Sequence, residues 1–357
     1  MDPAALTPEQ RQAHKNAIRG FVLSGAELQG EARTRYAQIQ DRMAELAQKF
    51  SENALDSTDA YAHYAGESEV EGIPGDALEA AAEGAKADGR EGYKFTLKLP
   101  SYLPVMQYAR SSALRETLYR AYATRASELA EGDAVKFDNT AIVREILALR
   151  HEEAQLLGYP DFATVSVVPK MAESPEQVIT FLRDLATRAR PYALQDLADL
   201  REFAAQELGL PDPQPWDWPY VGEKLKEARY SFSDQEVKLY FPAPKVLAGL
   251  FKIVETLFGV AIRRDQAPVW HPSVEFYRIE RAGERVGQFY LDPGARKGKR
   301  GGAWMDDVRT RWLRPDNGHL QTPVAHLVCN FSESVGGRPP LLLSLIHISE
   351  PTRQEAI

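Results

Sequence analysis

Several features are scarce or missing in this chain of 357 residues, and each narrows what it can be. A single cysteine, Cys329, excludes an internal disulfide framework and a cysteine-rich zinc site, and it fits a reducing compartment. No apolar run approaches transmembrane length, and residues 1–19 have no apolar signal-peptide core, so we expect a cytoplasmic protein. A net charge of −8 argues against nucleic acid or an anionic membrane as the main partner.

Sequence motifs for catalysis are equally sparse. There is no G-x-S-x-G elbow and no phosphate-binding loop. A zinc helix requires histidines four positions apart with a glutamate after the first, yet His151-Glu152-Glu153 is followed by Gln155 where the second histidine should stand. We therefore interpret this segment as a solvated helix face. The remaining histidines show no ligand spacing: His14, His63, His271, His319, His326 and His347. The sequence thus predicts no metal ligands and no catalytic residues in this chain.

What is present in the first half is helical. Thr7-Pro8-Glu9-Gln10 forms a capping box with proline at the first helical position. An apolar stripe from Ala32 to Phe50 recurs at steps of three and four, which predicts one long helix. Residues 93–99 alternate apolar and polar side chains and predict a strand that ends at Pro100. A further helix from residue 175 contains Pro191, where we expect a kink or break.

Toward the C-terminal end, the helical spacing of apolar residues gives way to strand-like patterns. Residues 274–279 and 286–291 read as a hairpin about a turn at 282–285, and residues 323–331 as a further strand with Cys329 in a packing role. We predict a mainly α protein organised as an α-helical region (1–210) and a region of helices plus a small β-sheet (211–342). Residues 343–357 fit neither. They resemble the translation of a transposon-end sequencing adapter, and we interpret them as a non-native tail.

The strongest local signal is a basic, glycine-rich segment. Four cations fall at residues 296–300, and Gly301-Gly302 then lead into Ala303-Trp304. Glycine pairs allow a backbone to approach a ligand closely, so Gly301, Gly302, Ala303 and Trp304 are our candidate substrate-binding residues, on a basic lip of a binding cleft followed by a strand. The alternative is an ordinary solvated loop, and the sequence leaves both open.

Eight stretches carry a family resemblance that covers nearly all of residues 6–342. The chain resembles the thimet oligopeptidase and neurolysin family of zinc metallopeptidases, at residues 99–106, 118–126, 145–151, 155–158, 170–173, 289–292, 299–306 and 329–331. The resemblance implies an elongated, multi-helix peptidase fold split by a deep channel. It also implies zinc-dependent endopeptidase cleavage of short peptides, in which zinc polarises the scissile carbonyl and a glutamate acts as general base.

The resemblance also identifies what we do not find. In the family, a segment like 336–342 leads into a His-Glu-Phe-Gly-His helix that binds zinc, and this helix is missing here. We therefore interpret the chain as an incomplete middle slice of a parent enzyme that uses zinc, and we expect no zinc on this chain and no activity from it alone. The alternative is a non-catalytic helical peptide-binding fragment or paralogue. Short peptides are the expected partners in either case.

Overall fold

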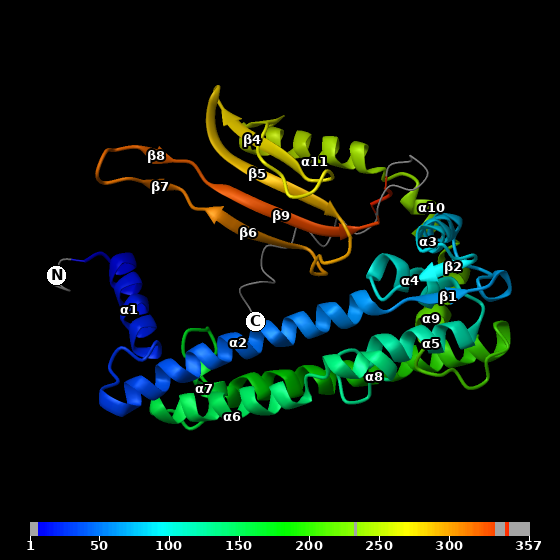
Figure 1. Cartoon of the computed structure of the whole chain (residues 1–357), viewed down its shortest axis with the longest axis horizontal. Coiled ribbons are helices and arrows are strands. Elements are labelled where there is room, and N and C mark those ends of the chain that lie inside the picture. The colour runs from blue at the N-terminus through cyan, green and yellow to red at the C-terminus, as the bar shows by residue number, and fades with distance from the viewer. Residues whose placement is uncertain (1–5, 232–233, 333–339, 343–357) are drawn as a thin grey trace. The chain divides into compact units, whose positions relative to one another are not determined.

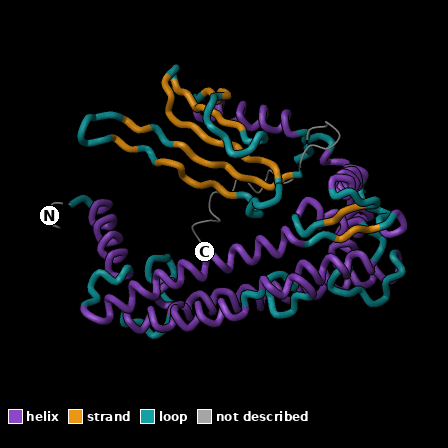
Figure 2. Tube along the Cα trace, in the orientation of Figure 1, coloured by secondary structure: helices purple, strands orange, loops and turns teal. Residues whose placement is uncertain are grey.

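The computed structural model describes residues 6–231, 234–332 and 340–342. The expected non-native tail, 343–357, lies outside the described residues. The chain forms two compact units, each built from two segments: Met1–Ser57 with Thr124–Glu202, and Thr58–Ala123 with Phe203–Ile357. The domain boundary expected near residue 210 stays a prediction. The architecture is mainly α with a small sheet near the C-terminal end, which confirms the predicted fold class (Figures 1 and 2).

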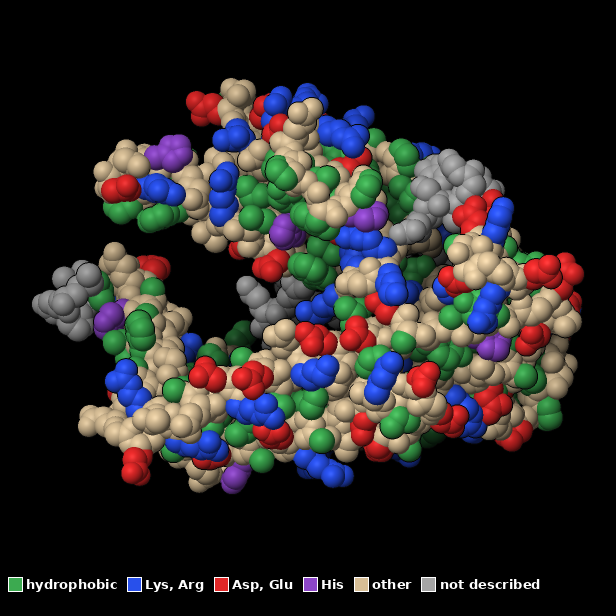
Figure 3. Space-filling model, viewed as in Figure 1, with side chains coloured by type: hydrophobic (Ala, Val, Ile, Leu, Met, Phe, Trp, Pro, Cys, Tyr) green, Lys and Arg blue, Asp and Glu red, His purple; other side chains and the backbone are tan. Residues whose placement is uncertain are grey.

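The first unit is helical. Its elements are α1 (Pro8–Leu23), most of α2 (Gly30–Ala60), a 3-10 turn η3 (Gly132–Phe137), α6 (Thr140–Leu156), α7 (Phe162–Val167) and most of α8 (Pro175–Glu207). The predicted capping box is present, since the Thr7 hydroxyl accepts from the Gln10 amide and the Gln10 side chain accepts from the Thr7 amide. The apolar stripe of α2 buries Ile39 and Leu46 against Leu149 of α6. Over the face drawn in Figure 3, acidic and basic side chains are interspersed along these helices.

The second unit combines a helical core with all the strands. Its elements are β1 (His63–Ala65), η2 (Glu67–Glu69), α3 (Gly75–Ala87), β2 (Tyr93–Phe95), α4 (Leu99–Tyr108), α5 (Ser112–Ala123), α9 (Trp218–Tyr230), α10 (Asp234–Lys238), α11 (Ala243–Phe258), β3 (Ala261–Arg264), β4 (Glu275–Arg281), β5 (Glu284–Gly294), β6 (Trp304–Arg309), β7 (Trp312–Leu313), β8 (Leu320–Gln321) and β9 (Val324–Phe331). Phe95, Leu97 and Val105 lie in a fully buried cluster with Leu114 and Leu118.

The main sheet has five strands in the order β3-β4-β5-β9-β6, with β5 and β9 parallel and the other pairs antiparallel. Helix α11 covers one face, where the Phe251 ring lies 5.0 Å from Tyr277 and 6.2 Å from Phe289. Strand β6 is an edge strand, and beyond it β7 and β8 pair with each other and extend the β6–β9 hairpin as a ribbon (Figure 1). The predicted hairpin, the strand after Gly302 and the buried packing role of Cys329 are confirmed.

Two local predictions need correction. The strand expected over 93–99 ends at Phe95, because Pro100 occupies the first turn of α4 and its missing N–H costs nothing there. Helix α8 runs through Pro191 as one helix, so the predicted break is wrong, while the alternative of a kink stays a prediction.

Candidate functional site

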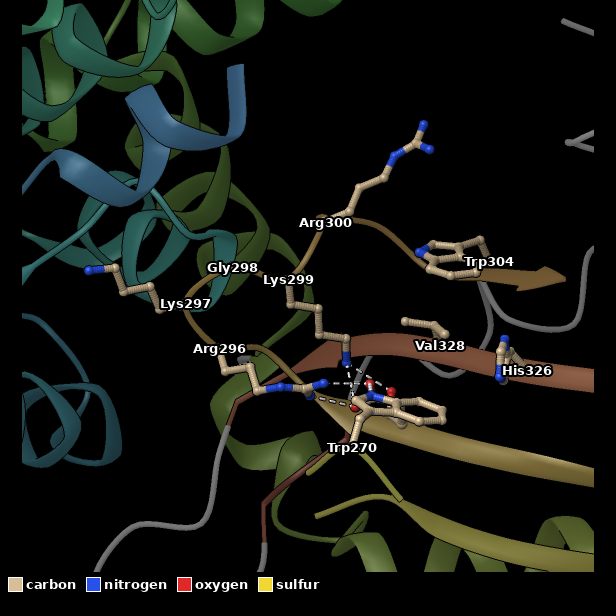
Figure 4. Close-up of a pocket in the computed structure, with 10 residues that line it drawn as sticks. Trp270, Arg296, Lys297, Gly298, Lys299, Arg300, Trp304, His326 and Val328 are labelled. Atoms are coloured by element: carbon tan, nitrogen blue, oxygen red, sulfur yellow. Dashed lines mark hydrogen bonds and ion pairs between the residues drawn. The ribbon is translucent and has the colours of Figure 1, made fainter. Parts of the chain in front are cut away.

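A pocket of about 430 Å³ opens on the face of the sheet opposite α11. Cross-strand partners in a sheet share a face, and Val328 of β9 is paired with Asp292 on one side and Trp304 on the other. The residues of strands β5, β9 and β6 therefore form the floor, and the loop between β5 and β6 forms the rim (Figure 4). The pocket is lined by Trp270, Asp292, Arg296, Lys297, Gly298, Lys299, Arg300, Trp304, His326 and Val328.

Asp292 is the electrostatic centre of this pocket, and its side chain is only 4% exposed. Arg296 donates to both carboxylate oxygens, at 2.6 and 2.8 Å, in the two-pronged geometry that guanidinium and carboxylate favour. Lys299 donates to Oδ1 at 2.8 Å and the Trp270 indole N–H donates to Oδ2 at 3.2 Å. The dashed lines in Figure 4 show these bonds converging on one point. The carboxylate thereby fixes two cations and one wall of the pocket.

Burial by itself would raise the pKa of Asp292, because a charged carboxylate is poorly solvated there. The hydrogen bonds from Arg296 and Lys299 outweigh that cost and bring the pKa of Asp292 down to about 2. Asp292 is therefore ionised at neutral pH. The loop carries four cationic side chains, at residues 296, 297, 299 and 300, and Asp292 neutralises the charge of only one of them. The rim of the pocket therefore keeps an excess of positive charge.

Aromatic rings form another wall. The Trp270 ring centroid lies 5.1 Å from both Tyr290 and His326, and Tyr290 and His326 face each other across the paired strands at 5.3 Å. Across the pocket, the indole nitrogen of Trp304 is buried and makes no hydrogen bond within the described part of the chain. The pocket thus combines apolar walls with a cationic rim.

The four predicted substrate-binding residues lie where the loop enters β6. Gly301, Gly302 and Ala303 are exposed, and Trp304 is the first residue of β6 and lines the pocket. The Asn330 side chain holds this segment from β9, donating to the carbonyl oxygens of Arg300 at 2.9 Å and Gly302 at 2.6 Å. Gly302 has a φ of +93°, a conformation that glycine adopts far more readily than other residues.

The basic run is not simply solvated. Lys299 is only 8% exposed, and its ammonium group also donates to the backbone carbonyls of Asp292 and Gly294 at 3.0 and 2.7 Å. Lys297 and Arg300 are exposed, and their side chains extend away from the pocket in Figure 4. The run therefore contains one structural lysine between outward-facing cations.

The helix face at His151 is also less solvated than predicted. Glu152 accepts two hydrogen bonds from Arg35 of α2, both at 2.7 Å, and Glu153 accepts one from Gln40 at 2.9 Å. The amide of Gln155 donates to the carbonyls of Tyr159 and Pro160 at the end of α6. This segment joins α6 to α2 and closes the helix, a structural role that its pattern did not reveal.

No set of ligands for a metal ion is present among the described residues, where we find no group of three or more His, Cys, Asp or Glu side chains suitably placed. In the pocket, His326 has only Asp292 as a potential co-ligand among these residue types, and that carboxylate is already bound by Arg296 and Lys299. The pocket does not fit zinc. None of the described helices is long and apolar enough to cross a membrane.

Comparison with known proteins places this site in context. The profile of Peptidase family M3 matches residues 105–345, which include the pocket and the glycine segment. The chain belongs to peptidase family M3. Over 341 residues it is 48% identical to oligopeptidase A of Escherichia coli (strain K12), a match that covers 95% of this chain and 50% of that protein. The resemblance predicted from the sequence is confirmed.

More distant M3 relatives match over a similar extent. The organellar oligopeptidase A of Arabidopsis thaliana is 39% identical, covering 96% of this chain and 44% of the relative. A dipeptidyl carboxypeptidase of Salmonella typhimurium is 31% identical, covering 90% of this chain and 47% of the relative. The chain therefore spans about half the length of the curated relatives it matches.

The sequence did not single out most of the pocket. Asp292, Trp270 and His326 come from separate segments. The register of β5 and β9 places Asp292 and His326 on one face, and Trp270 joins them from the connection between β3 and β4 through its contacts with both side chains. The one available signal was the pair of cations four and seven residues after Asp292, which could have suggested a local carboxylate–cation cluster.

Proposed function

We propose that this chain supplies the peptide-binding sheet of a zinc-dependent endopeptidase that hydrolyses short oligopeptides. Family membership supports the reaction class. The observation that carries the binding role is the position of β6: it is an edge strand of the sheet, and the glycine segment leads directly into it. An edge strand presents backbone N–H and C=O groups to which an extended peptide can add as a further strand.

The residues of the glycine segment have roles in this proposal that suit their environments. Gly301 and Gly302 let a peptide backbone approach, and Ala303 keeps the approach to β6 open. Trp304 offers an apolar wall beside the first peptide residues. Peptidase family M3 is zinc-dependent, but we expect no zinc bound to the described residues, so no chemical step is assigned to them. The chain alone is expected to bind peptides without cleaving them. A cytoplasmic setting is a separate expectation, which the single cysteine fits.

Hydrogen exchange with a short, unstructured peptide tests this role. Alternate amides of an edge strand point away from its partner, so a bound peptide should slow exchange at residues 303–309. Gly301→Val is the sharpest variant, because nothing lies within 4 Å of a Cβ at that position and its φ is not positive. We expect it to fold normally and to weaken peptide binding about tenfold, roughly 1.4 kcal/mol.

Gly249→Val, at an open position on α11 away from β6, is the matched control and should bind like the original chain. A quenched fluorescent version of the same peptide should remain uncleaved by the 357-residue chain. Unchanged binding in Gly301→Val, or no protection of β6 by a bound peptide, would contradict the binding role. Chelator-sensitive cleavage by this chain would contradict the expected inactivity.

A further inference from the structure

We infer that Asp59 and Lys98 are positioning residues for the peptide-binding segment, which they hold in place through the turn at Gly298 and Lys299. This inference rests on the proposed function of residues 301–304. Neither residue belongs to the sheet: Asp59 lies in the last turn of α2, and Lys98 is the N-cap residue of α4. Both belong to the same compact unit as the sheet.

The contacts form a short relay. The Gly298 amide donates to Asp59 Oδ2 at 2.7 Å, and the Lys98 ammonium lies 2.5 Å from Asp59 Oδ1. The same ammonium donates to the Lys299 carbonyl at 3.4 Å. The Asp59 and Lys98 side chains are 8% and 19% exposed, so the ion pair is partly shielded from water. Bonds to a charged acceptor are stronger than neutral ones, and shielding strengthens them further.

The relay completes the anchoring of the loop. On the β5 side, the Lys299 side chain is bound to Asp292, and on the β9 side, Asn330 holds the Gly302 carbonyl. Between these anchors the turn at Gly298 has a φ of +76° and directs its amide outward to Asp59. If this contact is lost, the turn can rotate between two fixed ends. Because only Arg300 separates Lys299 from Gly301, such rotation would alter how Gly301 and Gly302 present their backbone to a peptide.

The sheet itself does not depend on this relay, since its register is set by strand pairing and by α11. Loss of Asp59 should therefore loosen the loop while β9 stays protected. This separates a positioning role from a general structural one.

Hydrogen exchange and peptide binding, measured on the 357-residue chain with the peptide used above, test the inference. In Asp59→Ala we expect exchange at residues 296–302 to accelerate about tenfold or more, as expected for loss of a hydrogen bond to a charged group. Exchange at 324–331 and 75–87 should stay unchanged, and the peptide Kd should rise about fivefold. Asp59→Asn keeps an acceptor for the Gly298 amide, so its exchange should lie between that of Asp59→Ala and the original chain.

Asp56→Ala is the matched control, an exposed acid one turn earlier on α2, and should change neither quantity. If loop exchange in both Asp59 variants stays within twofold of the original chain, the relay does not hold the loop. If the loop loosens and peptide binding does not change, Asp59 is not a positioning residue. If the original chain binds no peptide, the proposed function fails and the positioning role with it, whereas the two preceding outcomes leave the proposed function intact.

Discussion

Arg115 and Asp217 form a buried ion pair that ties α5 to the start of α9, and its removal is a stringent test of the second unit. The two side chains are 1% and 3% exposed, and Arg115 Nη2 lies 2.6 Å from Asp217 Oδ1. Arg115 also donates to the carbonyls of Ala109 and Arg110, and its guanidinium lies 4.4 Å from the centre of the Tyr220 ring. A substitution at Arg115 therefore removes the charged partner of Asp217 and a hydrogen-bond donor to two backbone carbonyls.

The expected loss of stability follows from the hydrogen bonds that Asp217 keeps after Arg115 is replaced. In Arg115→Met, Asp217 keeps the Ser112 hydroxyl at 2.8 Å and the Gln214 amide at 2.9 Å, but these two neutral donors cannot compensate its charge. Breaking a buried pair on one side costs about 3–5 kcal/mol. We expect a loss of that size in the free energy of unfolding of the second unit. The double variant Arg115→Met with Asp217→Leu should lose less than the sum of the two single variants, because it leaves no uncompensated charge.

Urea unfolding followed by tryptophan fluorescence is a suitable assay, because Trp216 donates to Ser112 within this network at 3.0 Å. Arg110→Ala is the matched control. Its partner is Glu71, and both side chains are 66% exposed, so we expect a change of about 0–1 kcal/mol. A change in Arg115→Met no larger than in Arg110→Ala would refute this account of the pair.

Two predictions concern titratable groups. Because the folded-state pKa of Asp292 is about 2 against an ordinary 3.8, its contribution is present above about pH 4 and lost as pH falls through 2. The difference between these two pKa values corresponds to about 2 kcal/mol in the free energy of unfolding. Between pH 4 and 2, urea unfolding should therefore show a smaller loss of this free energy in Asp292→Asn than in the original chain. Equal losses in the two proteins would contradict the prediction. Burial raises the pKa of the Cys329 thiol to about 11, so a thiol reagent at pH 7.5 should label it only after denaturant is added, and rapid labelling of the folded chain would show that the site is open.

Helix and strand boundaries were predictable where the cause lies within a few residues. The Thr7–Gln10 capping box is of this kind, and α1 begins at Pro8 as the sequence indicates. The apolar spacing from Ala32 to Phe50 predicted a long helix, and α2 contains that whole stretch although it extends beyond both of its ends. The strand at 93–99 failed because Leu97 continues the alternation yet packs into the helical core beside Val105, and the chain turns into α4. Over seven residues, an alternation of apolar and polar side chains cannot distinguish one long strand from a short strand that is followed by a helix.

The pocket was harder to predict because its residues are assembled by sheet register. The cationic run looked the same for Lys299 as for Lys297, yet one is buried on Asp292 and the other is exposed. The difference arises because the loop bends back over the end of β5 and brings Lys299 within reach of carbonyl groups at Asp292 and Gly294. The sequence of the cationic run does not predict this bend of the loop.

The same reasoning explains why the glycine segment could be proposed as a candidate site from the sequence, while Asp59 and Lys98 could not. A glycine pair beside cations is a local anomaly, and anomalies can be read without knowing the fold. Asp59 in α2 and Lys98 at the N-cap of α4 are ordinary residues in their local sequence, and they are 239 and 201 residues from their partners Gly298 and Lys299. Their proposed role follows only from the contact that the Gly298 amide makes with the Asp59 carboxylate. A residue that contacts a ligand often stands out in its local sequence. A residue that orients the contact is recognised only by the partner it binds, and that partner is seen only in the structure. Positioning residues therefore have to be found from the structure and tested by hydrogen exchange of the loop, as proposed for Asp59.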